Sequence, residues 1–220
     1  MRYRQLHPWQ VSIAEAIEIQ NRLRAQVLAE GEPAAVRLVA GVDIGLREGV
    51  VRAAAVVLDY PRLSVVESSV AERELEFPYV PGLLSFREAP AILEAMAGLR
   101  WEPDIIFVDG QGVAHPRRFG IASHLGLLLD RPTVGCAKSI LTGRHGPVGA
   151  AAGDRAPLLD GQDLVGYALR TRAGAKPIYV SVGHRIGLEA AVAWTLCCCH
   201  GYRLPEPTRR AHLLASQREG

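Results

Sequence analysis

Two aspartates, each placed where an apolar run ends, constrain this chain more than any other feature. Asp43 follows the run 38–42, and Asp109 follows Ile-Ile-Phe-Val at 105–108. Short, continuous runs of this kind are typical of strands buried on both faces. A carboxylate beside such a strand must be paired, solvated or bound to a metal, because burying it alone costs several kcal/mol. One such aspartate often only caps the next helix, whereas two on neighbouring strands indicate a carboxylate cluster for a divalent cation.

The composition is that of an ordinary globular protein. The chain has 220 residues, of which 49% are hydrophobic and 22% charged, so we expect a single domain spanning residues 1–220. The net charge of +2 is too small to establish a polyanionic partner. Arginines nevertheless cluster locally, which is compatible either with a phosphate-tracking face or with a solvated surface. These clusters contain Arg117, Arg118, Arg144, Arg170, Arg172, Arg209 and Arg210.

Neither a membrane segment nor a secretion signal is apparent. No stretch reaches the roughly 20 apolar residues that span a bilayer, and the first residues lack an apolar signal core. We therefore expect a reducing, cytoplasmic setting. Cys197, Cys198 and Cys199 are consecutive and followed by His200. Contiguous residues of a helix point in different directions, so packing within a helix is favoured over a zinc site.

The first half of the chain predicts one helix, three strands and a second helix. Apolar residues at helical spacing, with Gln20 on the same face, predict an amphipathic helix over 12–29. Strands are expected at 37–44, 50–59 and 64–74, joined by turns at 45–49 and 60–61 as an antiparallel meander. A stiff loop with two prolines follows at 77–82. Ser85 and Glu88 then have the spacing of a capping box for a helix that ends near residue 99.

The second half alternates strands with helices. A strand at 104–109 precedes a glycine-rich loop, and later segments complete the pattern. We expect helices near 119–129, 187–200 and 205–217, a strand at 132–136, an exposed excursion at 142–161, and a hairpin of 164–170 with 178–182. This order predicts an α/β protein with an RNase H-like fold, whose mixed central sheet combines an antiparallel meander with parallel strands. A doubly wound nucleotide-binding fold would alternate from the start.

Glu88 is a third candidate carboxylate. By itself it is a glutamate in the first turn of a helix, which the helix dipole favours. Together with Asp43 and Asp109 it offers the hard oxygen ligands that Mg²⁺ or Mn²⁺ prefers. A cation held there would activate an attacking water and stabilise charge on a leaving oxygen.

Five segments, taken together, resemble one known family. They are Val-Ala-Gly-Val-Asp-Ile-Gly at 39–45, Pro-Tyr-Val-Pro-Gly-Leu-Leu-Ser-Phe-Arg-Glu at 78–88, Phe-Val-Asp-Gly-Gln-Gly-Val-Ala-His-Pro-Arg at 107–117, Ile-Ala-Ser-His-Leu-Gly at 121–126 and Gly-Cys-Ala-Lys-Ser at 135–139. This set resembles endonuclease V from about residue 10 to 215. The resemblance implies a metal-dependent nuclease acting at deaminated adenine, that is, at hypoxanthine.

The resemblance also assigns catalytic roles at matching positions. Asp43, Glu88 and Asp109 match the metal-binding carboxylates of the family. His212 matches a fourth polar residue on the last helix, although it is also compatible with a surface histidine. Lys138 matches a lysine that contacts the cleaved phosphate, where an ammonium suits the developing oxyanion.

Substrate recognition is expected to involve a wedge loop and a base pocket. A rigid, proline-bracketed aromatic can enter the space left by a displaced base. The implied wedge is Pro78, Tyr79, Val80 and Pro81, and the implied pocket residues are Gly82, Leu84, Gly110, Gly120 and Ile121. His115 either contacts a phosphate or holds its loop. Gln111 departs from the histidine common at its position, which puts one local contact in doubt.

The implied reaction is hydrolysis of the second phosphodiester bond on the 3′ side of deoxyinosine, as a step of DNA repair, with a 3′-hydroxyl and a 5′-phosphate as products. The compact length favours DNA and a bacterial type of enzyme, and we expect a monomer. Three alternatives stay open: an endoribonuclease acting on inosine in RNA, a non-catalytic nucleic-acid-binding module, and an actin-like ATPase suggested by Gly-Val-Asp-Ile-Gly at 41–45. The ATPase needs two domains and a second phosphate-binding element, for which 220 residues are too few.

Overall fold

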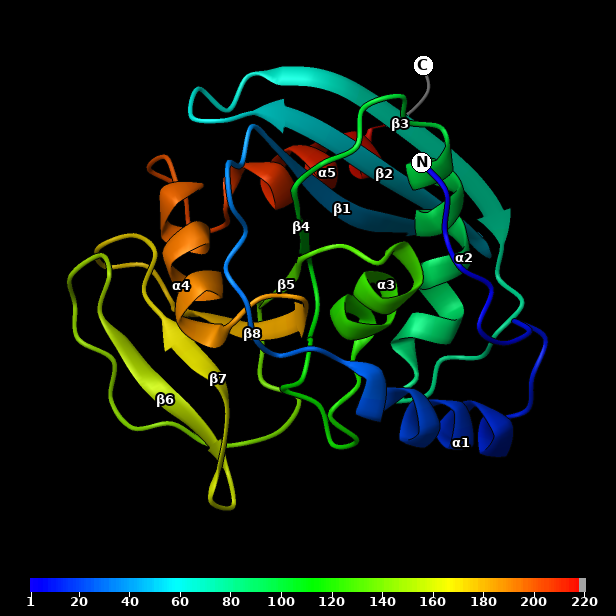
Figure 1. The fold of residues 1–220 in the computed structure, drawn as a ribbon, viewed down its shortest axis with the longest axis horizontal. Coiled ribbons are helices and arrows are strands. Elements are labelled where there is room, and N and C mark those ends of the chain that lie inside the picture. Colours follow the sequence, from blue (N-terminus) through cyan, green and yellow to red (C-terminus); the bar gives the residue numbers. More distant parts are fainter. Residues whose placement is uncertain (218–220) are drawn as a thin grey trace.

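A single mixed β-sheet organises the chain, as the computed structural model in Figure 1 shows. The structure describes residues 1–217, so the last three residues of the predicted domain lie outside the described residues. The strands are β1 (Leu38–Arg47), β2 (Val50–Asp59), β3 (Val65–Glu74), β4 (Ile105–Val108), β5 (Thr133–Ala137), β6 (Arg155–Asp160), β7 (Asp163–Leu169) and β8 (Ile178–His184). The α-helices are α1 (Ile13–Leu23), α2 (Leu84–Ala97), α3 (Ile121–Leu129), α4 (Leu188–Cys197) and α5 (Glu206–Ser216).

The sheet confirms the predicted α/β fold of RNase H-like type. Its strand order is β3-β2-β1-β4-β5-β8-β7-β6. The first three strands form the predicted antiparallel meander, while β1, β4 and β5 run parallel to one another. The remaining strands pair antiparallel, including the predicted hairpin of β7 with β8.

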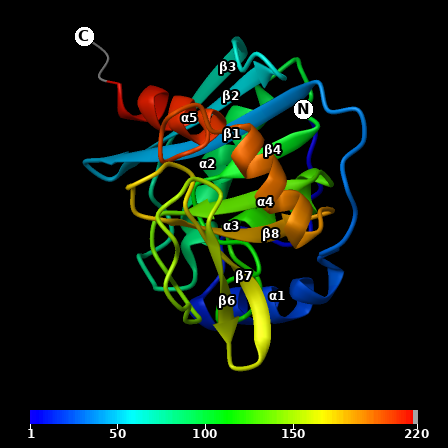
Figure 2. The same cartoon turned by 90° about the vertical axis from the view of Figure 1, so that its left-hand side faces the viewer.

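Helices cover both faces of the sheet. One buried core lies between the sheet and α2 with α3, and a second lies between the sheet and α4 with α5. Figure 2 shows α4 and α5 in front of the sheet, and Figure 1 shows α1 lying below α3. Because the central strands are apolar on both faces, each needs a helical layer on both sides.

The pairing register places the two strand-end aspartates side by side. Val42 of β1 is opposite Val108 of the parallel strand β4, so Asp43 and Asp109 are the next residues along these two adjacent strands. The backbone amide of Asp109 donates to the carbonyl of Val42 at 3.4 Å. The carboxyl ends of parallel strands meet at one edge of a sheet, which explains why two sequence-distant carboxylates become neighbours.

Two local predictions were wrong. The turn expected at 45–49 is shorter, since β1 continues through Arg47 and only Glu48 and Gly49 reverse the chain. The capping box expected at Ser85 is absent: α2 begins at Leu84, and no side chain in the described part of the chain caps it. The analogous motif exists at α1, where Ser12 and Glu15 satisfy each other's backbone amides.

The strand β6 was missed, because it lies within the segment predicted to be an exposed excursion. It pairs with β7 and forms one edge of the sheet. Only Ala156 and Leu158 of this strand are buried, and Pro157 lies between them. Proline is confined to edge strands because it cannot donate to the ladder, so the sequence signal for a strand was weak.

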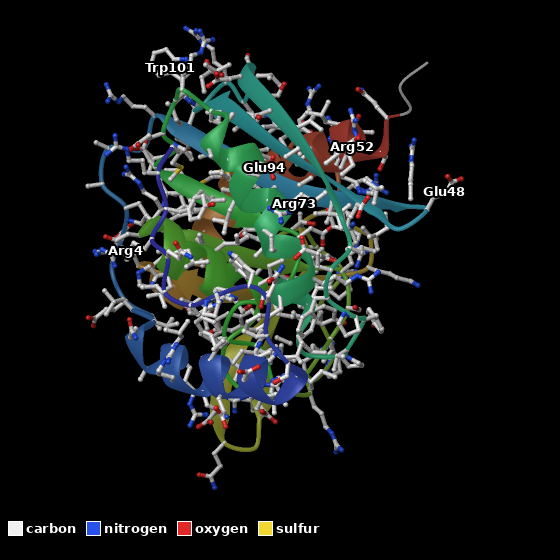
Figure 3. All side chains as sticks on the ribbon, turned by 90° about the vertical axis from the view of Figure 1, so that its right-hand side faces the viewer. Arg4, Glu48, Arg52, Arg73, Glu94 and Trp101 are labelled. Carbon is white, nitrogen blue, oxygen red and sulfur yellow. The ribbon has the colours of Figure 1, made fainter. Side chains whose placement is uncertain are left out.

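The periphery shows ordinary surface chemistry. Figure 3 shows Arg73 of β3 facing Glu94 of α2, with 3.6 Å between Nη1 and Oε2, and Glu48 at the tip of the β1–β2 hairpin.

Cys198 is buried while Cys197 is exposed, and neither belongs to a group of metal-ligating residues within the described chain. Within residues 1–217 no helix has the length and apolar character needed to cross a membrane.

Candidate active site

Asp43 and Asp109 form the centre of the candidate active site. Asp43 is only 9% exposed, and its Oδ1 accepts a hydrogen bond of 2.8 Å from the amide of Ile44. The Asp109 carboxylate forms an ion pair with the Nζ of Lys138, which follows β5. Three neighbouring parallel strands therefore bring these side chains to one edge of the sheet.

Glu88 approaches the two aspartates from the first turns of α2 and is also buried. Burial raises the pKa of Glu88 to about 8, and the negative charges of Asp43 and Asp109 contribute to this increase. Burial and the charge of Asp109 also raise the pKa of Asp43, against opposing effects of Ile44, Lys138 and His212. Carboxylates brought together without enough compensating charge behave in this way.

His212 reaches the site from α5. Its Nδ1 lies 2.7 Å from Oδ2 of Asp43, although the imidazole is about half exposed. Two glycines of β1 permit this approach. A Cβ at Gly41 would lie 2.0 Å from the backbone of Pro207, and one at Gly45 would lie 2.6 Å from the carbonyl oxygen of Ala215. The glycines on both sides of Asp43 therefore let α5 pack directly against the strand.

The three carboxylates have the donor chemistry of a divalent-cation site but are not arranged as a closed one. Within residues 1–217 no three His, Cys, Asp or Glu side chains converge closely enough to hold a metal ion. Asp109 is instead engaged by Lys138, and Asp43 by His212. Hard oxygen donors and raised carboxylate pKa values suit Mg²⁺ or Mn²⁺, whose charge would offset the repulsion.

A pocket of about 360 Å³ adjoins the carboxylates. Asp109 and Lys138 form part of its wall, whereas Asp43, Glu88 and His212 do not. Every predicted substrate-binding residue except Pro78 lines it. These residues are Tyr79, Val80, Pro81, Gly82, Leu84, Gly110, His115, Gly120 and Ile121. The structure therefore places the predicted recognition residues and two predicted catalytic residues around one cavity.

The carbonyl of Gly82 anchors the proline-rich loop to the rest of the pocket. It accepts hydrogen bonds from Gln20 Nε2 at 3.0 Å, from His115 Nε2 at 2.9 Å and from Arg117 Nη2 at 2.8 Å. Gly82 adopts φ +81°, a left-handed conformation that favours glycine. Three donors on one carbonyl hold the end of this loop while Tyr79, 71% exposed, extends from its middle.

The contacts of His115 favour a loop-holding role over phosphate binding. Its Nε2 donates to Gly82, and its Nδ1 accepts from the amide of Arg117 at 3.0 Å. Burial lowers the pKa of His115 to about 4, so the ring is neutral at physiological pH. Both ring nitrogens are already used within the protein.

Gln111 links the two loops that carry Asp109 and Lys138. Its Nε2 donates to the carbonyl of Ser139 at 2.7 Å, and it also lines the pocket. Its Oε1 is buried and finds no hydrogen-bond partner among residues 1–217. The local contact that the sequence left in doubt is therefore a bridge between the ends of β4 and β5.

Several pocket residues had no predicted role. Gln20 is 1% exposed, and besides Gly82 it donates to the carbonyl of Phe119 at 3.0 Å. A usable signal existed, since Gln20 was the one polar residue on the apolar stripe of its predicted helix. Ser85, which the sequence distinguished only as a helix cap, also lines the pocket, as do Ile140 and Leu141, which no pattern distinguished.

The side chains of most of the clustered arginines have partners within the protein. Arg209 and Arg210 both bind Glu206, and Arg118 binds Asp160 and Asp163. Arg170 donates to backbone carbonyls of its own loop region. The guanidinium groups of these four arginines are therefore held by partners within the protein.

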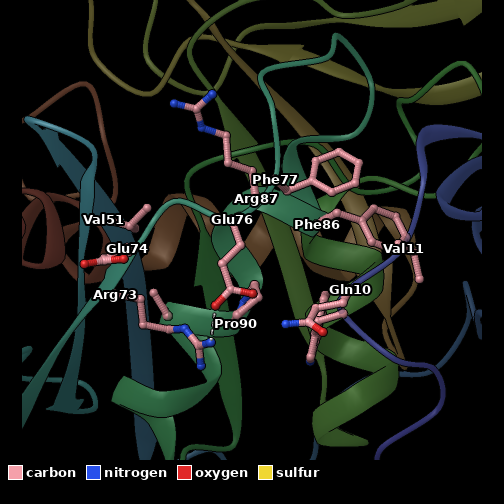
Figure 4. Close-up of a pocket in the computed structure, with 12 residues that line it drawn as sticks. Gln10, Val11, Val51, Arg73, Glu74, Glu76, Phe77, Phe86, Arg87 and Pro90 are labelled. Carbon is pink, nitrogen blue, oxygen red and sulfur yellow. Dashed lines mark hydrogen bonds and ion pairs between the residues drawn. The ribbon is translucent and has the colours of Figure 1, made fainter.

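A second groove, of about 430 Å³, lies on the other side of the start of α2. Figure 4 shows Arg73 paired with Glu76 inside it and Arg87 directed away from that pair. Phe77 and Phe86 form its apolar side. It contains none of the predicted site residues, so the smaller pocket beside Asp109 is the better candidate for substrate.

Comparison with known proteins identifies the family of this chain. The family model described as Endonuclease V matches residues 19–213. The chain is 53% identical over 212 residues to an endonuclease V of Gloeobacter violaceus, covering 94% of this chain and 86% of that protein.

Solved structures show the same similarity. The crystal structure of an endonuclease V from Streptomyces avermitilis matches with a TM-score of 0.90 and 48% identity, covering 98% of this chain and 96% of that one. An endonuclease V of Ciona intestinalis, bound to a 23mer DNA containing an inosine followed by a ribo-adenosine, matches with a TM-score of 0.83 and 26% identity, covering 92% and 95% of the two chains.

Proposed function

The chain belongs to the endonuclease V family, and on that premise we propose that it is an endonuclease cutting DNA at deoxyinosine. The observation that carries this proposal is the shared wall of the pocket. Residues suited to hold a flipped base, such as Gly110 and Ile121, line the same cavity as Asp109 and Lys138. Enzymes that act at a damaged base extrude it into such a pocket.

Tyr79 is proposed as the wedge that supports base flipping. Its ring is largely exposed and lies on a loop held at Gly82, so it can stack without unfolding the loop. The guanidinium of Arg87 lies 5.7 Å from the ring centroid and supports its orientation. A fixed aromatic of this kind compensates for the stacking lost when the base leaves the duplex.

Asp43, Glu88 and Asp109 are proposed to hold Mg²⁺, or alternatively Mn²⁺. Such a cation, when bound, lowers the pKa of a coordinated water and stabilises charge on phosphate oxygens. The chain contributes the carboxylates and, through Lys138, an ammonium positioned next to them. A cation held there would compete with Lys138 for the Asp109 carboxylate, and the displaced ammonium would be available for a phosphate oxygen.

The proposed cut lies at the second phosphodiester bond on the 3′ side of the lesion. Gly110 adjoins Asp109, and Leu84 lies one helical turn from Glu88, so the base site and the carboxylates are close but distinct. Hydrolysis there leaves the base attached, a 3′-hydroxyl and a 5′-phosphate. We assign the reaction to DNA repair, carried out in the cytoplasm by a monomer.

An end-labelled oligonucleotide with one deoxyinosine tests these assignments together. In Mg²⁺ the product should migrate as a cut one nucleotide beyond the lesion, and EDTA should abolish it. The variants Asp43→Asn and Asp109→Asn should lose cutting while retaining lesion binding and a cooperative melting transition. Release of free hypoxanthine, or cutting that ignores the inosine position, would contradict the proposal.

RNA is a second candidate substrate. The Ciona relative was solved with an inosine followed by a ribonucleotide, which is the position beside the proposed cut. Three matched strands would separate the alternatives: all-DNA, DNA with one ribonucleotide after the inosine, and all-RNA. We expect the all-DNA strand to be cut efficiently. Preference for the all-RNA strand by a large factor would make this chain a ribonuclease with the same site.

A further inference from the structure

A chain of buried polar groups leads from the pocket into the core. Ser85 Oγ lies 3.0 Å from Nδ1 of His124, and Nε2 of His124 lies 2.7 Å from Nε2 of His7. The other nitrogen of His7, Nδ1, lies 2.7 Å from the carbonyl oxygen of Pro8. Ser85 lines the pocket beside Leu84, whereas the two histidines do not.

The contact between His7 and the carbonyl of Pro8, at the far end of this series of polar groups, determines where each proton lies. A carbonyl can only accept, so Nδ1 of His7 carries a proton and, in the neutral ring, Nε2 is an acceptor. Nε2 of His124 must then donate to it, which leaves Nδ1 of His124 as an acceptor. The hydroxyl of Ser85 donates to that nitrogen, and its only proton is used there.

Both histidines are in surroundings that keep them neutral. Burial lowers the pKa of His124 well below its usual value, with a smaller effect of His7. Burial also lowers the pKa of His7, and the charge of Arg22 acts in the same direction, while the bond to Pro8 opposes them. The rings of Trp9 and Phe86 pack against both imidazoles. Among residues 1–217, no acidic side chain is a cause of the pKa shift of either histidine.

We propose that this series of hydrogen bonds, the relay of Ser85, His124 and His7, makes Ser85 a specificity-determining residue that presents only lone pairs to the base pocket. An acceptor at the wall favours hypoxanthine, whose N1 carries a hydrogen. It opposes adenine, whose N1 carries a lone pair. His124 and His7 are positioning residues, since they act on the base through Ser85. The assignment rests on the proposed function, because it concerns the base that the pocket receives.

The geometry explains why a serine can discriminate here. A free hydroxyl both donates and accepts, so it can satisfy either form of N1 by rotating. Because the Ser85 hydroxyl donates its proton to His124, it cannot rotate to donate to the base. If adenine enters, the lone pair of its N1 faces a lone pair of Ser85 Oγ, and no hydrogen bond can form between them. The two buried acceptors left without a partner weaken the binding of adenine.

The relay can be tested without any substrate. Nitrogen-15 shifts of the imidazole side chains in the full-length protein at neutral pH report the tautomers directly. We expect the Nδ1–H form at His7 and the Nε2–H form at His124. The opposite tautomer at His124 would free the Ser85 proton and overturn the proposal, whatever the enzyme cuts.

The effect on recognition is tested with single strands that carry either deoxyinosine or the 2′-deoxyribonucleoside of unsubstituted purine. The purine base has a lone pair at N1 and no O6. Single strands are used because base pairing then does not differ between them. In Ser85→Ala, the ratio of binding affinities for the two strands should fall at least about fivefold from its wild-type value. Contacts to O6 contribute equally before and after the change, so they cancel in this comparison.

Two further variants complete the test. Ser123→Ala removes another buried serine hydroxyl, whose Oγ has no hydrogen-bond partner among residues 1–217 and which does not line the pocket. It should leave the ratio unchanged. His7→Phe removes the acceptor for His124 and should lower the ratio although Ser85 is intact. An unchanged ratio in Ser85→Ala would overturn the proposal, and an unchanged ratio in His7→Phe alone would overturn the part assigned to the histidines. A wild-type protein without preference for inosine would overturn the proposed function itself.

Discussion

His212 Nδ1 and Asp43 Oδ2 lie 2.7 Å apart, although 169 positions separate the two residues in the chain. The contact joins the last helix to the central strand at the candidate active site. It depends on Gly41 and Gly45, which let the backbone of α5 approach β1. A half-exposed histidine on a surface helix thereby becomes part of the carboxylate cluster.

Replacing His212 by alanine should move the pH dependence of cutting. The hydrogen bond from His212 lowers the pKa of Asp43, in opposition to burial and to the charge of Asp109. Without it the pKa of Asp43 rises further, so the ionised form appears only at higher pH. We expect the acidic limb of kcat/KM to shift to higher pH, with lower activity at neutral pH. His200→Ala, an exposed histidine outside the site, is the control, and an identical profile in both variants would contradict the prediction.

Gly41→Ala should destabilise the protein and impair cutting together. The added Cβ would lie 2.0 Å from backbone atoms of Pro207, which cannot rotate away. Displacing α5 should cost about 1–3 kcal/mol in the free energy of unfolding and separate His212 from Asp43. Denaturant unfolding and cutting assays measure the two effects. Gly146→Ala is the matched control, because its Cβ meets nothing within 4 Å, and it should be close to neutral.

The raised pKa of Glu88 predicts how stability varies with pH. An unfolded glutamate loses its proton near pH 4.5, whereas Glu88 in the folded chain keeps it until about 8. The folded state binds more protons between these values, so the contribution of Glu88 to stability is present below about 4.5 and is lost as pH rises towards 8. Between about pH 5.5 and pH 8, the melting temperature of metal-free wild type should fall more than that of Glu88→Gln.

Divalent cations should reverse that loss. A cation held by Glu88 and the two aspartates favours their ionised forms, so Mg²⁺ should raise the melting temperature more at pH 8 than at about pH 5.5. Glu88→Gln should respond much less, while Glu18→Gln, at an exposed position, should respond as wild type does. An equal response to Mg²⁺ in wild type and Glu88→Gln would argue against Glu88 as a ligand.

Tyr79→Ala should weaken lesion binding more than it slows cutting. The ring is 71% exposed, so its loss should leave the melting temperature nearly unchanged. Base–aromatic stacking is typically worth about 1–3 kcal/mol, which should appear as weaker binding to inosine duplex. Single strands, whose bases are already unstacked, should be affected less. Tyr3→Ala, at another exposed tyrosine, serves as control. A uniform loss on all substrates would exclude a wedge.

Local sequence patterns were sufficient to predict the main elements of this fold and the positions of Asp43 and Asp109 at strand ends. Apolar runs such as Ile105–Val108 are long enough and uniform enough to predict buried strands, and Asp43 and Asp109 end such runs. The side-chain period of two and the parallel pairing then place both aspartates at the same edge. The resemblance to endonuclease V added the roles of residues that no local pattern distinguishes.

The partner of each polar group, in contrast, depends on the packing of helices and strands and could not be predicted from local patterns. Ser85 fits a capping box by spacing, yet its hydroxyl is used by His124 from another helix. The clustered arginines suggest a phosphate-binding face, yet Arg118 forms ion pairs with Asp160 and Asp163. Hydrogen bonds and ion pairs depend on groups brought together from distant parts of the chain. A sequence pattern reports what a residue can do locally, whereas its actual partner depends on how helices and strands pack.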